Sequence, residues 1–403
     1  MKRNTLLVVV VAVAAFFLLF NPLQWFSGNK NNVRRPSTDA SKVTPLAQFA
    51  QDSWRSPSDY IVKTFATHDI VFLGEMYKIK QNVTLVSSLI PALYAAGVRS
   101  LGIEYALSDD QAQIDALLGA PTWDESKARQ ITFDWLVTWG FQEYVDIYKA
   151  AWTFNRGLAA GAKPFRIVGL SVRENWQYIK TARDGTDAGV VAKVFANGIP
   201  DAHMAEVIQS QFVATGEKAL IYTGTQHIFT RYHSTPYEKN AASMKLAETR
   251  RAGNIIFAAI GNRAFAISLH APWPDASNKT GFGFPVGGLI DAMIDALPDS
   301  KKSGGWDTAG TALGSLSVNT TAYATSAKTG TLADVFDGYI VQGPIKDFAT
   351  VTPIKDFITA ANIDRANASF PGVKPDKPYT VEQLTKAIQD DLDSTASVFA
   401  QFR

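Results

Sequence analysis

Apolar runs recur along the chain, and helical patterns separate most of them. After the first run, Val86, Leu89, Ile90 and Leu93 repeat at the spacing of one helix face, up to Gly97. This alternation predicts an α/β fold with a largely parallel β-sheet that is flanked by helices on both faces. Because the connections between the last strands are short, we expect part of the sheet to be antiparallel. The predicted strands are residues 69–74, 98–105, 164–172, 218–227, 254–261, 264–270 and 338–344.

A long helical pattern lies between the second and third predicted strands. Its aromatic residues recur at intervals of four, which predicts a helical cap over about residues 106–160 that packs on the sheet. A groove floor for an apolar or planar ligand is the alternative. Residues 379–402 have the pattern of an amphipathic helix, with Thr380 as its capping residue. The aromatic stripe consists of Trp135, Trp139, Tyr144, Tyr148 and Trp152.

The N-terminal segment carries the clearest local signal. Residues 5–20 contain no charge and span about 24 Å as a helix, and continuation to Phe26 reaches roughly 33 Å, enough to cross a bilayer. Basic residues precede the segment, which favours a cytoplasmic N-terminus. We therefore predict a transmembrane signal anchor at residues 5–26. A cleaved signal peptide is the alternative, but no convincing small-x-small cleavage pattern follows Phe20.

This anchor divides the chain into four parts. Residues 1–4 are the predicted cytoplasmic tip, residues 27–50 a polar, flexible linker, and residues 51–403 an exported α/β domain. The predicted location is the inner membrane, crossed once, with the main domain in the periplasm or outside the cell. A flexible tether of this composition holds the domain roughly 25 Å from the membrane.

Composition excludes several classes of chemistry. The chain of 403 residues has no cysteine, which rules out disulfides, thiolate metal sites and a cysteine nucleophile. Its net charge is +2, with both signs mixed along the sequence, so we expect no nucleic acid partner. The sequence contains neither a G-x-S-x-G nor an H-E-x-x-H motif, so standard serine hydrolases and zincins are excluded.

Polar side chains follow four of the predicted strands. Because the carboxyl ends of parallel strands meet at one edge of a sheet, these groups are expected to converge. Two carboxylates and an imidazole suit a divalent metal, and equally a metal-free hydrolysis in which a histidine or glutamate activates water. A glutamate at a strand end can also simply stabilise the next helix. The residues are Glu75 and Tyr77 after the first strand, Glu104 after the second, Arg173 after the third, and Gln226, His227, Arg231 and His233 after the fourth.

Three short motifs carry a resemblance to a known superfamily. They are "GEMY" (74–77), "LGIEY" (101–105) and "GTQH" (224–227). In order and spacing they resemble the G-x-x-H, glutamate and second G-x-x-H of the superfamily that groups erythromycin-esterase-like proteins, ChaN-type haem-binding proteins and TraB/Tiki proteins. The resemblance covers roughly residues 65–270. It implies an α/β domain with a helical cap, a site at the strand ends, and metal-dependent peptide cleavage, ester hydrolysis or haem binding.

The functional residues of the superfamily carry over only in part. Glu75, Glu104 and His227 match, and the resemblance implies that they are catalytic or bind a metal. Tyr77 stands where the pattern has histidine. A phenol with a pKa of about 10 neither ligates a metal nor accepts a proton readily near neutral pH. As a phenolate, however, tyrosine can ligate ferric haem iron.

Three hypotheses follow from these residues. The first is a membrane-anchored exported hydrolase that cleaves an ester or peptide bond with Glu75, Glu104 and His227, with or without a divalent metal. The second is a haem- or iron-binding protein of the cell envelope. The third is a catalytically inactive module that binds envelope proteins, because Tyr77 replaces the first histidine. In each case Tyr77, Arg173, Gln226, Arg231 and His233 are the candidate ligand-binding residues.

Overall fold

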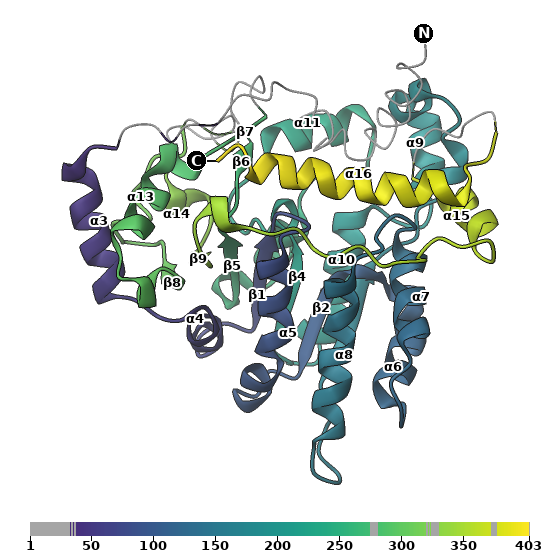
Figure 1. Ribbon diagram of the computed structural model, residues 1–403, viewed down its shortest axis with the longest axis horizontal. Helices are drawn as coiled ribbons and strands as arrows, with labels where there is room; N and C mark the ends of the chain where they lie inside the picture. Colours follow the sequence, from purple (N-terminus) through teal and green to yellow (C-terminus); the bar gives the residue numbers. More distant parts are fainter. Residues whose placement is uncertain are drawn as a thin grey trace.

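A seven-stranded β-sheet runs through the centre of the protein (Figure 1). The computed structural model describes residues 33, 35, 38–274, 281–319, 321, 323, 330–371 and 377–402. The strand order is β3-β2-β4-β1-β5-β9-β8, and all neighbouring pairs are parallel except β9 and β8. The predicted α/β fold is therefore confirmed. The strands are β1 (Ile70–Glu75), β2 (Ser100–Leu107), β3 (Arg166–Ser171), β4 (Ala219–Gly224), β5 (Ala264–Leu269), β8 (Gly304–Asp307) and β9 (Gly338–Val341).

One of the predicted strands is a helix. Residues 254–261 were expected as a strand, but they lie almost entirely in α12 (Ala252–Ile260). A short apolar run fits a buried strand and a buried helix equally well, so the pattern alone does not decide. The side chain of Asn254 accepts a hydrogen bond from the backbone N–H of Arg251 (3.1 Å), which favours a helix start. The antiparallel part of this sheet is β8, which the apolar pattern does not reveal.

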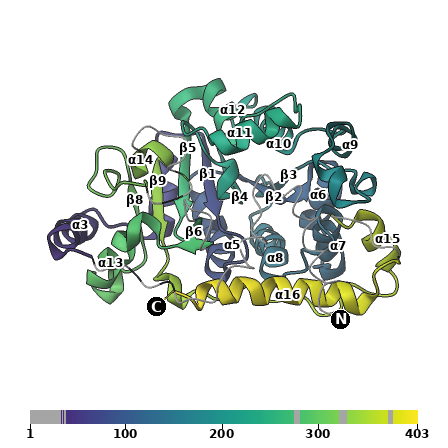
Figure 2. The ribbon, with the colours of Figure 1, turned by 90° about the horizontal axis from the view of Figure 1, so that it is seen from above.

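Helices cover both faces of the sheet (Figure 2). On one face lie α5 (Lys80–Ala95) and α8 (Gln142–Arg156), and on the other lie α10 (Pro200–Ile208) and α12. Successive residues of a strand point to opposite faces. Leu73 and Tyr222 accordingly pack in the core beneath α5 and α8, whereas Phe72 and Ile221 pack beneath α10 and α12. Because both faces are buried, the strands are apolar throughout rather than alternating.

The predicted helical cap at about residues 106–160 is helical, and its last helix belongs to one of these layers. The region contains α6 (Gln111–Gly119), α7 (Glu125–Trp135) and α8, and α8 packs along α5. Tyr144 and Tyr148 are each only 1% exposed in the core. The packing interpretation of the aromatic stripe therefore holds for α8.

The predicted linker is partly wrong. Residues 40–50 lie in α3 (Ala40–Asp52), which packs on α13 (Leu289–Ala296). The helix begins where the side chain of Asp39 accepts a hydrogen bond from the backbone N–H of Ser41 (2.9 Å). The predicted anchor, residues 5–26, lies outside the described residues. Within the described ranges, no helix is long and apolar enough to cross a membrane.

The long C-terminal helix agrees with the sequence pattern. α16 (Val381–Phe399) follows Thr380, whose hydroxyl accepts a hydrogen bond from the backbone N–H of Gln383 (3.2 Å). The side chain of Gln383 accepts one from the Thr380 N–H in return (2.8 Å), so both orphan donors are satisfied. The shorter elements are α4 (Pro57–Thr64), α9 (Ala188–Val194), α11 (Thr235–Ser243), α14 (Leu332–Val335), α15 (Ile363–Ser369), β6 (Trp273–Pro274) and β7 (Phe282–Gly283).

Ile221 tests how much the packing of the central strand contributes to stability. Its side chain is fully buried between β4 and the layer of α10 and α12. We expect Ile221→Ala to lower the free energy of unfolding by about 2–5 kcal/mol and Ile221→Val by about 0.5–1.5 kcal/mol, because the larger truncation leaves the larger cavity. Urea unfolding followed by circular dichroism measures both values. Equal losses in the two variants would contradict this packing.

Candidate functional site

A cavity of about 240 Å³ lies at the carboxyl ends of β1, β2 and β4. This is the edge at which open α/β sheets bind their ligands. Its walls are largely apolar and aromatic, and they include the indole rings of Trp135, Trp139, Trp176 and Trp273. An apolar cavity with a few convergent polar groups is typical of a small-molecule site. The polar side chains in its wall include Glu75, Tyr77, Lys78, Glu104, Glu174, Asp201, Gln226, His227 and Arg251.

Five of the predicted site residues line this cavity, and three do not. Glu75, Tyr77, Glu104, Gln226 and His227 are brought together, as expected from the strand ends. The other three lie outside the cavity wall and are left out of the site. Arg173 is exposed and donates a hydrogen bond to the backbone carbonyl of Asp134, Arg231 pairs with Asp337, and His233 is exposed and pairs with Glu238.

The two glutamates reach the cavity from opposite faces of the sheet. Glu75 pairs with Gly224 in the register of β1 and β4, two positions beyond Tyr222, so Glu75 and Tyr222 point to the face of α5 and α8. Thr223 points to the opposite face, and its hydroxyl donates a hydrogen bond to Glu104 (2.6 Å). Because successive strand residues point to opposite faces, the carboxylates of Glu75 and Glu104 have different neighbouring side chains.

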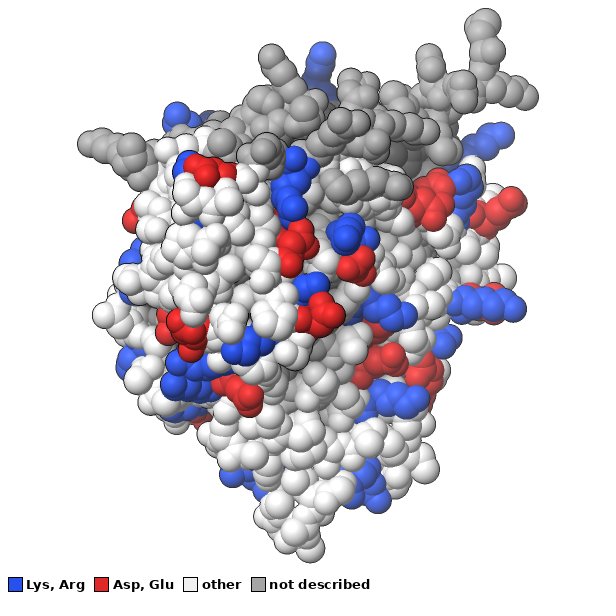
Figure 3. All heavy atoms as spheres, turned by 60° about the vertical axis from the view of Figure 1, so that its left-hand side comes forward, with Lys and Arg blue, Asp and Glu red and all other residues white. Residues whose placement is uncertain are grey.

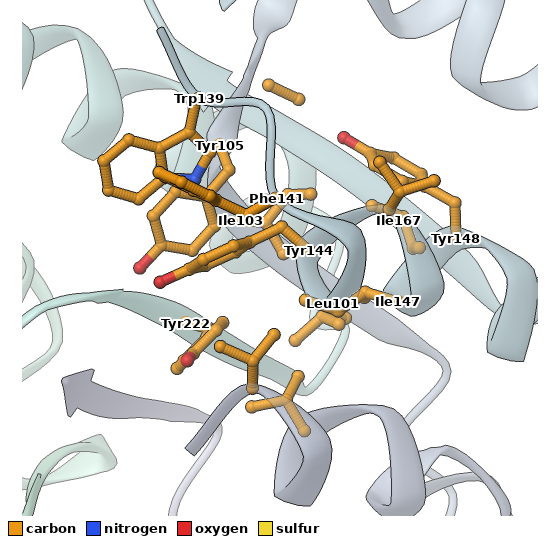
Figure 4. Close-up of a cluster of buried hydrophobic side chains, with 14 of the residues drawn as sticks. Leu101, Ile103, Tyr105, Trp139, Phe141, Tyr144, Ile147, Tyr148, Ile167 and Tyr222 are labelled. Carbon is orange, nitrogen blue, oxygen red and sulfur yellow. The ribbon is translucent and has the colours of Figure 1, made fainter. Parts of the chain in front are cut away.

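Glu75 is enclosed by tyrosines. Its side chain accepts hydrogen bonds from the hydroxyl groups of Tyr105, Tyr144 (2.7 Å) and Tyr222 (2.5 Å). Figure 4 shows these rings packed together, with Trp139 stacked on Tyr105. The residue is 1% exposed, and this burial raises the pKa of Glu75 to about 8, although the three phenols act in the opposite direction. The raised pKa therefore favours the protonated form of Glu75 near neutral pH.

His227 belongs to a chain of charged groups on the other face. Its Nδ1 lies 2.8 Å from an Asp201 oxygen, and its Nε2 lies 3.6 Å from Glu104 Oε1. The other Asp201 oxygen accepts a hydrogen bond from Arg251 (3.0 Å). Burial disfavours the charged imidazole, but the carboxylates of Asp201 and Glu104 outweigh it and raise the pKa of His227 above its ordinary value. Burial also disfavours the Asp201 carboxylate, yet the charges of His227 and Arg251 outweigh it and lower the pKa of Asp201 strongly.

Tyr77 is held as a neutral phenol beside Glu104. Its hydroxyl donates to the Glu104 carboxylate (3.0 Å), which also accepts a hydrogen bond from the backbone N–H of Gly224 (2.8 Å). Burial and the charge of Glu104 raise the pKa of Tyr77 well above its usual range. The ring lies against Gly224, where a β-carbon would come within 2.1 Å of the phenol oxygen. Glycine at this position therefore makes room for the tyrosine.

The residues present do not fit the predicted metal site. Within the described part of the chain, no three histidine, aspartate or glutamate side chains are arranged to hold a metal ion. Glu75, Glu104 and His227 were the expected ligands, but the oxygens of Glu75 are occupied by phenol donors. Tyr77, the expected ligand of haem iron, donates a hydrogen bond to Glu104 in this structure.

Several residues of the site were not predicted from the sequence. Asp201 and Arg251 lie at the starts of α10 and α12, far from any strand end, and nothing in the apolar pattern links them to His227. Tyr222 and Tyr105 lie within strands, where aromatic residues are ordinary core residues. The one usable signal was Tyr105, which directly follows Glu104 and so points to the opposite face; both lie inside β2, which continues past the expected end to Leu107.

Comparison with solved structures bears on the fold. A succinoglycan biosynthesis protein is similar with a TM-score of 0.53 at 10% identity, covering 79% of this chain and 100% of that one. A mutant erythromycin esterase, EreC, in its open conformation is similar with a TM-score of 0.47 at 12% identity. The match covers 76% of this chain and 100% of the esterase chain. ChaN of Campylobacter jejuni with cofacially bound haem has a TM-score of 0.35 at 12% identity. The match covers 55% of this chain and 89% of the ChaN chain. The similarity to the succinoglycan biosynthesis protein shows that the two chains share an α/β fold. No family model and no curated protein matches the sequence.

The protonation of Glu75 can be tested by infrared spectroscopy. We expect a carboxylic acid carbonyl band at pH 7 that is absent in Glu75→Gln and disappears as the pH rises through about 8. Tyr222→Phe should move this midpoint to higher pH, because it removes a donor that stabilises the carboxylate. A Glu75 that is ionised at pH 5 would contradict this account of the tyrosine cage.

Proposed function

We propose that the protein is a hydrolase that cleaves an ester or peptide bond without a metal, with His227 as the general base. The observation that supports this proposal is the Asp201–His227 pair. Asp201 accepts a hydrogen bond from Nδ1–H, and this bond fixes the tautomer whose Nε2 lone pair is left for proton transfer. His227 forms part of the wall of a largely apolar cavity, which would keep the reacting bond away from bulk water.

In the proposed reaction, His227 Nε2 takes a proton from water as the water oxygen attacks the carbonyl carbon of the substrate. The resulting imidazolium lies between two carboxylates, Asp201 at Nδ1 and Glu104 at Nε2, and both stabilise its positive charge. The imidazolium then returns the proton to the leaving oxygen or nitrogen. The products are a carboxylic acid and an alcohol or amine, so atoms and charge balance.

The other polar groups of the site would position this pair. Arg251 and the backbone N–H of Ala252 hold the Asp201 carboxylate at 3.0 and 2.8 Å. Tyr77 and Thr223 hold Glu104 from the opposite side. In this proposal Tyr77 is not a substitute base for the missing histidine. It replaces a second imidazole with a neutral donor, so a single histidine performs both proton transfers.

The cavity wall supports a substrate with an apolar or planar part. Trp135, Trp139, Trp176 and Trp273 offer ring faces and edges, and they are joined by Phe195 and Phe282. A small, strongly charged substrate would find few partners there, because Lys78 and Arg251 are already paired with Asp391 and Asp201. We therefore propose esters or amides of aromatic or aliphatic acids as the first substrates to test.

We also propose that the protein is attached to the membrane through residues 5–26, with the α/β domain outside the cytoplasm. The support is the sixteen-residue uncharged segment at positions 5–20, preceded by basic residues. Protease treatment of intact and of permeabilised cells distinguishes the two sides of the membrane. Digestion of the domain only after the inner membrane is broken would contradict this location.

Turnover of a panel of aryl and alkyl esters tests the reaction. We expect His227→Asn to lower the rate about 10²–10⁴-fold, because it removes the general base while keeping a similar shape. His233→Asn is the matched control: His233 is exposed, lies outside the cavity wall and should leave the rate unchanged. An active His227→Asn variant would overturn the mechanism. A wild-type protein that cleaves no member of the panel, yet retains envelope proteins on purification, would favour the binding module.

The pH dependence of the rate tests the role of Asp201. A general base works only when neutral, so the rate should fall as the pH drops through the raised pKa of His227. Asp201→Asn removes the negative charge at Nδ1, so the pKa of His227 should fall and the acid limb of the profile should move to lower pH. The maximal rate should also fall, because the tautomer is no longer fixed. An unchanged acid limb would show that Asp201 does not act through His227.

A further inference from the structure

The start of the described chain is fastened to its C-terminal end. The backbone N–H of Val33 donates a hydrogen bond to the carbonyl of Gln401 (2.8 Å), and Val33 forms a parallel bridge with Phe402. Close by in sequence, Arg35 forms an ion pair with Asp295 of α13 (2.5 Å). Val33, the first described residue, is therefore fixed beside Gln401 and Phe402 on the surface of the domain.

That place lies at the carboxyl edge of the sheet. Val33 and Phe284 pack against an apolar cluster that includes Phe402, here called the end cluster. Three of its buried members come from segments that directly follow strand ends, and three residues of the cluster also line the cavity. The segments after β1, β5 and β9 contribute Ile79, Ala271 and Ile345, and the residues shared with the cavity wall include Met76 and Phe282.

The helix that leads to this place is also tied to the cavity. Asp391 of α16 forms an ion pair with Lys78 (2.5 Å), three residues beyond β1, and Thr395 of the same helix lines the cavity. The ammonium group of Lys78 lies over the ring of Trp139, 5.2 Å from its centroid. The cavity wall, α16 and the attachment point of Val33 are thus parts of one packed edge.

The length of chain before Val33 limits how far this edge can lie from a membrane. Only residues 27–32 separate the predicted anchor from Val33. Even fully extended, six residues reach about 20 Å. The predicted linker of residues 27–50 would have allowed free tumbling, but its second half is part of the folded domain.

We propose that the N-terminal segment holds the carboxyl edge of the sheet, with its cavity, against the membrane surface. The inference rests on the membrane attachment proposed above. The partner of this face is the bilayer, and the cavity is then supplied from the membrane rather than from bulk solution. The substrate class that follows is an amphiphilic ester or amide whose apolar part resides in the same membrane.

The face shown in Figure 3 has no basic patch that would orient the domain on anionic lipids. On the face shown in Figure 3, Lys and Arg residues are interspersed with Asp and Glu rather than gathered in a basic patch. The net charge of the chain is only +2. Attraction to anionic lipids needs clustered basic residues. The short tether at Val33 is therefore the feature that would set the orientation.

Single cysteines can measure this orientation, because the chain contains none of its own. Ser397→Cys labels an exposed position on α16 near the end cluster, and Ala160→Cys labels an exposed loop between α8 and β3 at the opposite, amino edge of the sheet (Figure 1). The full chain with a dye on each cysteine is reconstituted into vesicles containing lipids with spin-labelled headgroups. We expect several-fold stronger quenching of the dye at position 397 than at position 160.

A longer linker provides the matched control. Insertion of thirty Gly and Ser residues between Ser27 and Gly28 leaves the anchor and the domain intact, and it should abolish the difference in quenching. Equal quenching at both positions in the unmodified linker would overturn the proposed orientation. A chain that does not float with the vesicles would instead overturn the membrane attachment itself.

Turnover separates this inference from the proposed chemistry. With the longer linker, hydrolysis of a fluorogenic ester embedded in the vesicles should fall several-fold, while hydrolysis of a water-soluble ester stays the same. If the longer linker does not slow hydrolysis of the embedded ester, supply of the substrate from the membrane is contradicted. The absence of both activities in the unmodified protein would overturn the proposed hydrolase, while the quenching experiment would still report on the orientation.

Discussion

The alternation of side chains along parallel strands is the constraint on which this site depends. Neighbouring strands end at the same edge, so Glu75, Glu104 and His227 are brought to one cavity although they are far apart in sequence. The same alternation sends Glu75 to one face of the sheet and Glu104 to the other. Two carboxylates that look equivalent in the sequence are therefore not a shared ligand pair. They form two different environments that meet at the edge of the sheet.

Burial then gives those environments opposite electrostatics. Glu75 has only neutral phenols as hydrogen-bond partners, so desolvation dominates and its proton is retained. Asp201 is equally buried but faces His227 and Arg251, and their positive charges keep it ionised. Two buried acids whose pKa values are driven apart are a recurrent feature of acid–base active sites. Here the ionised acid contacts the imidazole, and for this reason the proposed chemistry centres on His227.

Tyr77, which stands where the resembled motif has histidine, also has a structural context. The phenol packs over Gly224 and donates to Glu104, and it is edge-on to both Tyr105 and Trp139. It is thus integrated into the cavity wall rather than left as a remnant of a lost histidine. Such local changes set the chemistry of a fold, because function resides in the site and not in the architecture.

Much of the architecture was determined by the sequence alone. Six of the seven strands, the capped helix after Thr380 and the convergence of Glu75, Glu104 and His227 follow from apolar periodicity and strand ends, which are local properties of the chain. The tertiary structure decided the rest. In the folded protein, residues 252–260 form a helix and residues 40–50 pack on α13. Arg173, Arg231 and His233 lie outside the cavity wall. Asp201 contacts both His227 and Arg251. The physical reason is that partners of a buried charge are selected by packing between elements remote in sequence, and no local pattern records that choice.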